Sequence, residues 1–123
     1  MPTFIWVFIG GGLGSICRYG IAEGLKSYQF TFPYATLLAN VLACFILGTM
    51  VGGALKTDID LSYRLLIMTG FCGGFSTFST FTYETFALLE QGKFTFALVN
   101  IGGSLFVCLV SIYLGLKIAN NTF

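Results

Sequence analysis

Four stretches of this chain are each long and apolar enough to cross a lipid bilayer as a helix, which takes about 20 apolar residues. Of the 123 residues, 56% are hydrophobic and only 9% are charged, so a chain this short could not hide its apolar surface from water. The sequence therefore predicts an all-α membrane protein with a single transmembrane domain over residues 1–123. The four spans are expected at roughly 3–22, 34–55, 61–89 and 94–118.

The third window contains the segment GFCGGFSTFST, residues 70–80, which weakens a helix. The window is also too long for one straight span, so we expect two half-helices joined by a break near its centre. Gly70, Gly73 and Gly74 would make that break sterically easy. Irregular backbone at membrane depth persists only where it is buried in protein or lines a cavity. Its freed carbonyls suit a hard cation such as Na⁺, and the N-terminus of the new half-helix attracts anions.

Phe75, Phe78 and Phe81 recur at intervals of three residues and so form a slanted stripe on a helix. A phenyl ring carries a positive edge, and ring edges could contact an anion weakly enough to release it. The alternative is that the stripe only packs against a neighbouring helix. Hydroxyl groups interleave with the rings and favour the first interpretation; they belong to Ser76, Thr77, Ser79 and Thr80.

Other polar residues lie within the predicted spans. Asn40 stands near the start of the second span and can donate two hydrogen bonds. Asn100 and Ser104 are four residues apart on the fourth span and share a face. Either group could simply hold helices together. Arg18 marks a positive vestibule if it lies deep in the first span, whereas near the span's end it would extend to the interface.

Positive charge is evenly distributed between the two sides of the membrane that four spans would create. One side carries three basic residues and the other side also carries three, so the positive-inside rule does not choose an orientation. The chain either inserts one way on a weak bias or inserts both ways and pairs head-to-tail as an antiparallel dimer. The two sets are Lys56, Arg64 and Lys117, and Arg18, Lys26 and Lys93.

Several function classes are disfavoured by composition. The chain has no histidine and no clustered acids, and no nucleophile has an evident base, so an enzyme is not expected. A net charge of +1 does not indicate a basic surface that would bind nucleic acid. The four cysteines fall one in each window at no metal or redox spacing, and we interpret them as small buried thiols.

The chain resembles the Fluc/CrcB family of small fluoride channels over essentially its whole length. The matching motifs are GGGLGSICRYG in the first span, LLANVLACFILG in the second and GFCGGFSTFSTF in the third. The resemblance implies an antiparallel, dual-topology homodimer in the bacterial plasma membrane. It also implies two pores for passive fluoride export, which protects the cell from fluoride toxicity.

The resemblance also implies roles for individual residues. Backbone carbonyls of Gly73 and Ser76 would bind a central structural sodium ion shared by both subunits. Asn100 stands where some relatives carry tyrosine, and Ser76 where some carry threonine. The residues implied for the anion pathway are Arg18, Asn40, Phe78, Ser79, Thr80, Phe81, Asn100 and Ser104.

Two other functions compete with a channel. A small dual-topology, proton-coupled multidrug exporter would need a carboxylate at mid-membrane. Glu84 is the only acid within the second half of the third span, and we interpret it as an interfacial residue. A membrane scaffold without transport would explain the packing but would leave the hydroxyl run without a purpose.

Overall fold

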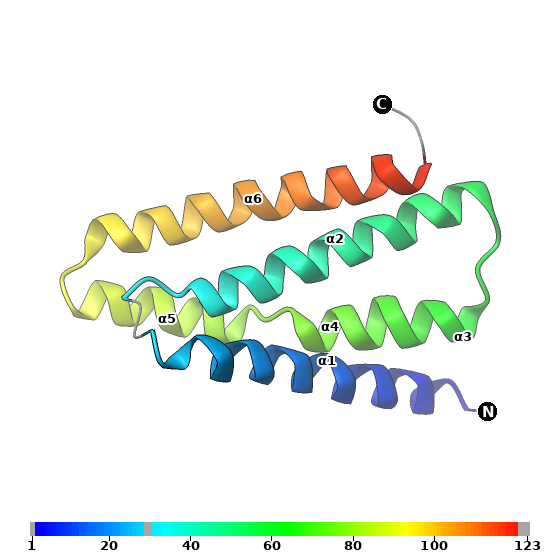
Figure 1. The fold of residues 1–123 in the computed structure, drawn as a ribbon, viewed down its shortest axis with the longest axis horizontal. Coiled ribbons are helices and arrows are strands. Elements are labelled where there is room, and N and C mark those ends of the chain that lie inside the picture. The colour runs from blue at the N-terminus through cyan, green and yellow to red at the C-terminus, as the bar shows by residue number, and fades with distance from the viewer. Residues whose placement is uncertain (1, 29–30, 121–123) are drawn as a thin grey trace.

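A computed structural model describes residues 2–28 and 31–120, which form four long helical segments lying side by side (Figure 1). The third segment consists of several pieces: a short α3, the wider π-helical η1, α4 and, after a break, α5. The elements are α1 (Thr3–Lys26), α2 (Tyr34–Lys56), α3 (Leu61–Tyr63), η1 (Arg64–Cys72), α4 (Gly73–Phe75), α5 (Ser79–Glu90) and α6 (Phe94–Asn120).

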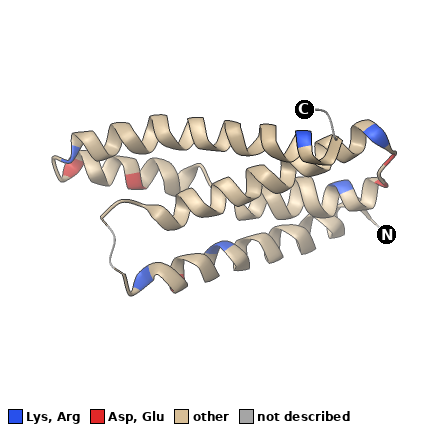
Figure 2. Cartoon of the chain, turned by 45° about the horizontal axis from the view of Figure 1, so that its top comes forward, with Lys and Arg blue, Asp and Glu red and all other residues tan. Residues whose placement is uncertain are grey.

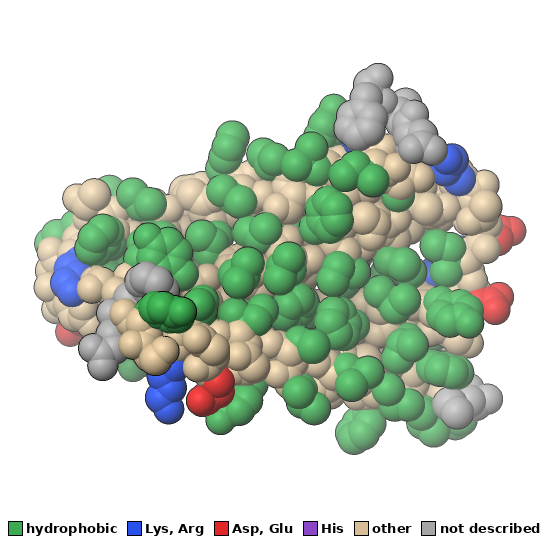
Figure 3. Space-filling view, in the orientation of Figure 1, with side chains coloured by type: hydrophobic (Ala, Val, Ile, Leu, Met, Phe, Trp, Pro, Cys, Tyr) green, Lys and Arg blue, Asp and Glu red, His purple; other side chains and the backbone are tan. Residues whose placement is uncertain are grey.

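The prediction of four membrane-crossing helices with a bent third one is confirmed, since four segments are long and apolar enough to span a bilayer. Both described ends of the chain lie at one end of the bundle, and α2 and α6 run in the same direction (Figure 1). Charged residues gather towards the two ends of the bundle (Figure 2). Hydrophobic side chains cover the middle of the face shown in Figure 3, as contact with lipid requires.

The helix α1 packs closely against η1 and α4 because glycines remove the side chains between the backbones. A Cβ on Gly10 would overlap the carbonyl oxygen of Leu66, and one on Gly14 would overlap that of Phe71. From the other side, a Cβ on Gly74 would overlap the carbonyl oxygen of Gly11. Small residues at helix interfaces usually allow two helix backbones to approach closely in lipid. Close packing, not the hydrophobic effect, drives helix association there.

The expectation that Gly70, Gly73 and Gly74 make the break sterically easy is wrong, because the break falls at none of them. All three lie in helical segments, and Gly73 has helical dihedrals of φ −63° and ψ −39°. The non-helical residues come later, at 76–78. Gly70 and Gly74 serve instead for contact with α1, where a Cβ on Gly70 would lie 2.9 Å from the carbonyl oxygen of Val7.

A second close pair, α2 and α6, has a regular register. A Cβ on Gly48 would overlap the carbonyl oxygen of Ile112, and one turn further along, a Cβ on Gly52 would lie 2.5 Å from that of Leu116. Because the helices run in the same direction, each further turn along α2 brings the next turn of α6 into contact. This register determines which side chains of the two helices meet nearer their beginnings.

Candidate functional site

The third span loses its helical conformation immediately after Phe75. Ser76 adopts an extended conformation with ψ 159°, and helix resumes at Ser79. The Ser76 hydroxyl donates to the Cys72 carbonyl at 2.7 Å, and the Ser76 N–H donates to the same oxygen at 3.0 Å, which ends the first half-helix. The break therefore spans residues 76–78, within the segment expected from the sequence.

Asn40 of α2 holds the break by pairing with both main-chain groups of Thr77. Its Oδ1 accepts from the Thr77 N–H at 2.8 Å, and its Nδ2 donates to the Thr77 carbonyl at 3.2 Å. In a continuous helix the Thr77 N–H would donate to the Gly73 carbonyl, four residues earlier. By accepting that N–H, Asn40 frees the Gly73 carbonyl from its helical donor.

The second half-helix is capped by the side chain of Thr77. The Thr80 N–H donates to the Thr77 hydroxyl oxygen at 3.2 Å, so the side chain just before the N-cap residue, Phe78, accepts a bond from the first turn. In a continuous helix that N–H would donate to the Ser76 carbonyl. The Thr77 side chain therefore takes the N–H that would otherwise donate to the Ser76 carbonyl. In the same way, Asn40 takes the N–H that would otherwise donate to the Gly73 carbonyl. Other N–H groups of the first turn have no helical partner and favour negative charge nearby.

Arg18 of α1 contacts the same region. Its Nε–H donates to the Gly74 carbonyl at 3.1 Å, across the helix interface that Gly14 makes possible. The guanidinium is half-buried, so the bond brings a permanent positive charge beside the end of the first half-helix. The C-terminal end of a helix is partly negative and stabilises such a cation.

A cavity of about 250 Å³ opens beside the break, between α2, α5 and α6. Its wall contains the rings of Phe78 and Phe81, whose centroids are 6.0 Å apart at a tilt of 39°. Phe78 is 79% exposed in the isolated subunit, so its ring is free to contact an ion or a second subunit. The full wall is formed by Asn40, Cys44, Ser76, Thr77, Phe78, Phe81, Ser104, Leu105 and Cys108.

Behind this wall, a chain of hydrogen bonds runs through buried polar side chains of α5 and α6. The Thr85 hydroxyl donates to the Phe81 carbonyl at 2.8 Å and accepts from Asn100 Nδ2 at 2.9 Å. Asn100 Oδ1 then accepts from the Ser104 hydroxyl at 3.2 Å. Asn100 is only 1% exposed, so it acts by fixing Phe81 and Ser104 in the wall.

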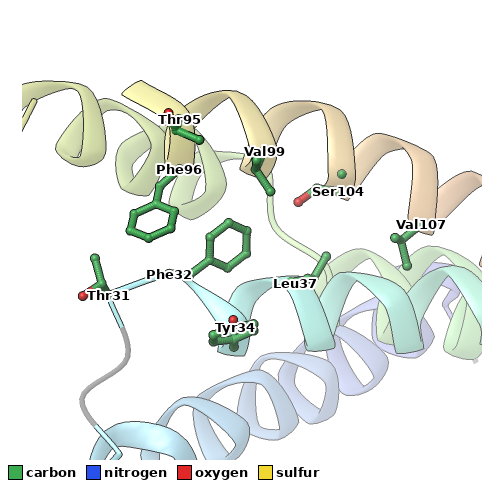
Figure 4. Close-up of a pocket in the computed structure, with 10 residues that line it drawn as sticks. Thr31, Phe32, Tyr34, Leu37, Thr95, Phe96, Val99, Ser104 and Val107 are labelled. Carbon is green, nitrogen blue, oxygen red and sulfur yellow. The ribbon is translucent and has the colours of Figure 1, made fainter. Parts of the chain in front are cut away.

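A larger cavity of about 580 Å³ lies nearer the beginnings of α2 and α6 (Figure 4). The rings of Phe32 and Phe96 meet there edge to face, with centroids 6.3 Å apart. Ser104 lines both this cavity and the one beside the break. The two cavities therefore adjoin at the hydroxyl group of Ser104.

The predicted pathway residues fall into two groups. Four of them line the cavity beside the break: Asn40, Phe78, Phe81 and Ser104. The other four lie outside its wall: Arg18, Ser79, Thr80 and Asn100. Ser79 is exposed at the first turn of α5, where its hydroxyl lies 3.4 Å from that of Thr77.

Sequence reasoning did not single out the capping role of Thr77 or the place of Thr85 in the polar chain. A threonine three residues before the N–H that it caps is a recognisable signal for Thr77. Thr85 gives no such signal, because its role depends on a partner in another helix. Glu84 lines a small cavity with Lys26 and with residues of the α1–α2 loop, and among the described residues its Oε1 is buried without a hydrogen-bond partner.

Comparison with known proteins gives one consistent family. Residues 5–116 match the model of the CrcB-like proteins, described as Camphor Resistance (CrcB). The chain is 42% identical over 122 residues to the "Fluoride-specific ion channel FluC" of Pyrococcus abyssi, covering 98% of both chains. It is 46% identical over 111 residues to the protein of that name from Prosthecochloris aestuarii, covering 89% of this chain and 87% of the relative. For the Geobacter sulfurreducens protein of that name, identity is 40% over 123 residues, covering 98% and 99%.

Proposed function

The chain belongs to the CrcB-like protein family and is a multi-pass membrane protein, and on these premises we propose that it is a fluoride-selective channel that lets cytoplasmic fluoride leave the cell passively. The observation that carries this proposal is the cavity where Phe78 and Phe81 stand beside the amide of Asn40 and the hydroxyl of Ser104. Ring edges, an amide and a hydroxyl can replace the water around a small anion without holding it by full charge. Such a function makes the chain a channel and not an enzyme.

Fluoride would reach this cavity from the larger one that it adjoins at Ser104. The N–H groups of the first turn of α5 would add positive potential at the break. Arg18 adds a permanent charge on the far side of the half-helix. The exporter alternative has less support, because Glu84 lies near an end of the bundle and the curated relatives are named as channels.

The test of this proposal is anion efflux from proteoliposomes made with the purified protein. Vesicles loaded with potassium fluoride should release fluoride when a potassium ionophore cancels the membrane potential. Vesicles loaded with potassium chloride should retain chloride under the same conditions. Equal release of both anions would refute fluoride selectivity, and release that occurs only with a proton gradient would favour an exporter.

We expect Phe78→Ile and Phe81→Ile each to slow fluoride efflux about tenfold, because isoleucine fills the space of the ring but has no positive edge. A tenfold change corresponds to about 1.4 kcal/mol of lost stabilisation. Phe86→Ile is the matched control, since Phe86 lies on the same helix as Phe81 and is 55% exposed outside the cavity. Initial efflux rates per reconstituted protein measure the effect. Unchanged rates in both cavity variants would contradict a role for the rings.

We further propose that two subunits pair head-to-tail around a structural sodium ion, giving two pores. The carbonyls of Gly73 and Ser76 fit this role, because their helical donors are diverted to Asn40 and Thr77. Nothing lies within 4 Å of the position of a Cβ on Gly73, so this backbone is open to a second subunit. Bare carbonyl oxygens suit a hard cation. Bound sodium would neutralise their partial charge at the centre of the dimer.

The paired arrangement gives two measurable results. In a variant whose native cysteines are replaced by alanine, Lys93→Cys is labelled with an impermeant maleimide. About half of the cysteines should react from each side of intact vesicles.

Sodium should also raise the temperature at which the purified dimer dissociates, whereas potassium at equal concentration should not, because a ligand of the native state stabilises it. Labelling from one side only would rule out dual topology, and equal effects of the two cations would rule out the sodium site.

A further inference from the structure

Two thiols lie together in the wall of the cavity beside the break. Cys44 belongs to α2 and Cys108 to α6, and both line the 250 Å³ cavity together with Phe78 and Phe81. Both cysteines are free and partly exposed in the described subunit.

The packing of α2 against α6 explains why these two residues meet. Gly48 contacts Ile112 and Gly52 contacts Leu116, in a register that advances one turn at a time. Cys44 lies one turn before Gly48, and Cys108 lies one turn before Ile112. The glycine contacts therefore bring the two backbones close at the level of Cys44 and Cys108, and both residues line the cavity there.

We propose that Cys44 and Cys108 form a two-thiolate site for a soft metal ion of the Cu(I) type. Thiolate sulfur prefers soft ions, and Cu(I) accepts two sulfur ligands in a line. In residues 2–28 and 31–120, no three His, Cys, Asp or Glu side chains come together to hold a metal, so a four-coordinate zinc site does not fit. Binding releases one proton from each thiol as its sulfur bonds the metal.

Occupancy of this site has a consequence for transport, which rests on the proposed fluoride function. A metal held between the two sulfurs would stand in the wall of the cavity that the rings of Phe78 and Phe81 also line. It would narrow the passage, and because Cu(I) between two thiolates carries a net negative charge, it would repel a fluoride ion. Soft metals would therefore inhibit the protein through a site distinct from the carbonyls that suit sodium.

The first experiment measures binding without transport. In a Cys17→Ala/Cys72→Ala variant, which leaves only the pair, the protein is titrated with Hg(II) as a soft, linear, redox-stable probe. One Hg(II) per subunit should remove both thiols from reaction with a thiol reagent. A need for two Hg(II) per subunit would overturn the proposal, as would one thiol remaining after one equivalent. Adding Cys108→Ala to this variant supplies the single-thiol control.

The second experiment measures fluoride efflux in the presence of Hg(II). The variant that retains only the pair should be inhibited, and a small dithiol should reverse the inhibition by removing the metal. Cys44→Ala/Cys108→Ala, which keeps Cys17 and Cys72, should need at least a tenfold higher Hg(II) concentration for the same inhibition. Equal sensitivity of the two variants would overturn the inhibitory role. If the unmodified protein conducts no fluoride, the channel proposal fails while the titration still decides the metal site.

Discussion

Replacing Asn40 with alanine is expected to slow fluoride efflux by roughly a hundredfold or more. The Asn40 amide makes two hydrogen bonds to the main chain of Thr77, and alanine can make neither. Leaving a buried polar group without its partner costs about 1–3 kcal/mol, so losing both partners costs about 2–6 kcal/mol in the conducting conformation. A penalty of only ~3 kcal/mol already corresponds to about two powers of ten. Asn40 also lines the proposed fluoride cavity, so its own donor would be lost as well.

Initial efflux rates in proteoliposomes measure this effect, with Thr49→Ala as the control on the same helix. The Thr49 hydroxyl bonds only the Ile46 carbonyl of its own helix at 2.7 Å, so its loss should leave the break intact. Efflux from Asn40→Ala at more than a third of the unmodified rate would mean that conduction does not require the two hydrogen bonds between Asn40 and Thr77. A comparable loss in Thr49→Ala would mean that the effect is not specific to the break.

Replacing Gly14 with alanine is expected to destroy the stable fold. The added Cβ would overlap the Phe71 carbonyl oxygen and would lie 2.7 Å from the Phe75 nitrogen. Both are backbone atoms, so α1 would have to move away from η1 and α4. Overpacking usually costs about 1–3 kcal/mol, and more where the neighbour cannot move. Separation would also weaken the bond from Arg18 to the Gly74 carbonyl, one turn further along the same interface.

The control for Gly14→Ala is Gly20→Ala, on the same helix. Gly20 is exposed, and nothing lies within 4 Å of a Cβ there. Alanine also favours helix by up to about 1 kcal/mol over glycine, so Gly20→Ala should be neutral or slightly stabilising. Size-exclusion chromatography after a series of heating steps gives the fraction of protein that survives. Equal survival of the two variants would contradict the close packing of α1 at Gly14.

The sequence was informative about the spans because a bilayer imposes their length and composition directly. The four apolar windows and the break within residues 70–80 follow from that constraint. The cause of the break could not be read in the same way. Three glycines suggested that a flexible backbone allows the break. The chain is nevertheless helical through all of them, and the helix ends before Ser76. Gly70 and Gly74 serve for contact with α1, which no local pattern in the third span reveals.

Much of the candidate site depends on contacts between helices, which spacing along one helix does not show. Asn100 and Ser104 were expected to share a face, and they are hydrogen-bonded. That Asn100 is buried behind the wall, and that it reaches Thr85, depends on how α5 packs on α6. The four cysteines had no informative spacing in the sequence, yet the register of α2 and α6 joins two of them. Cys17 is exposed in the subunit, contrary to the expectation of a buried thiol.

The partnership of Asn40 with Thr77 has a consequence for how the protein assembles. The third span carries nothing within residues 76–78 that forbids a helix, since no proline or glycine stands there. A peptide of residues 61–90 alone in lipid would keep the local bonds of Ser76 and Thr77 but would lose both bonds from Asn40, so we expect its Thr77 N–H to return to the Gly73 carbonyl. The interruption is therefore completed by a neighbour that precedes it in the chain. We expect this helix to bend fully only when it docks against α2.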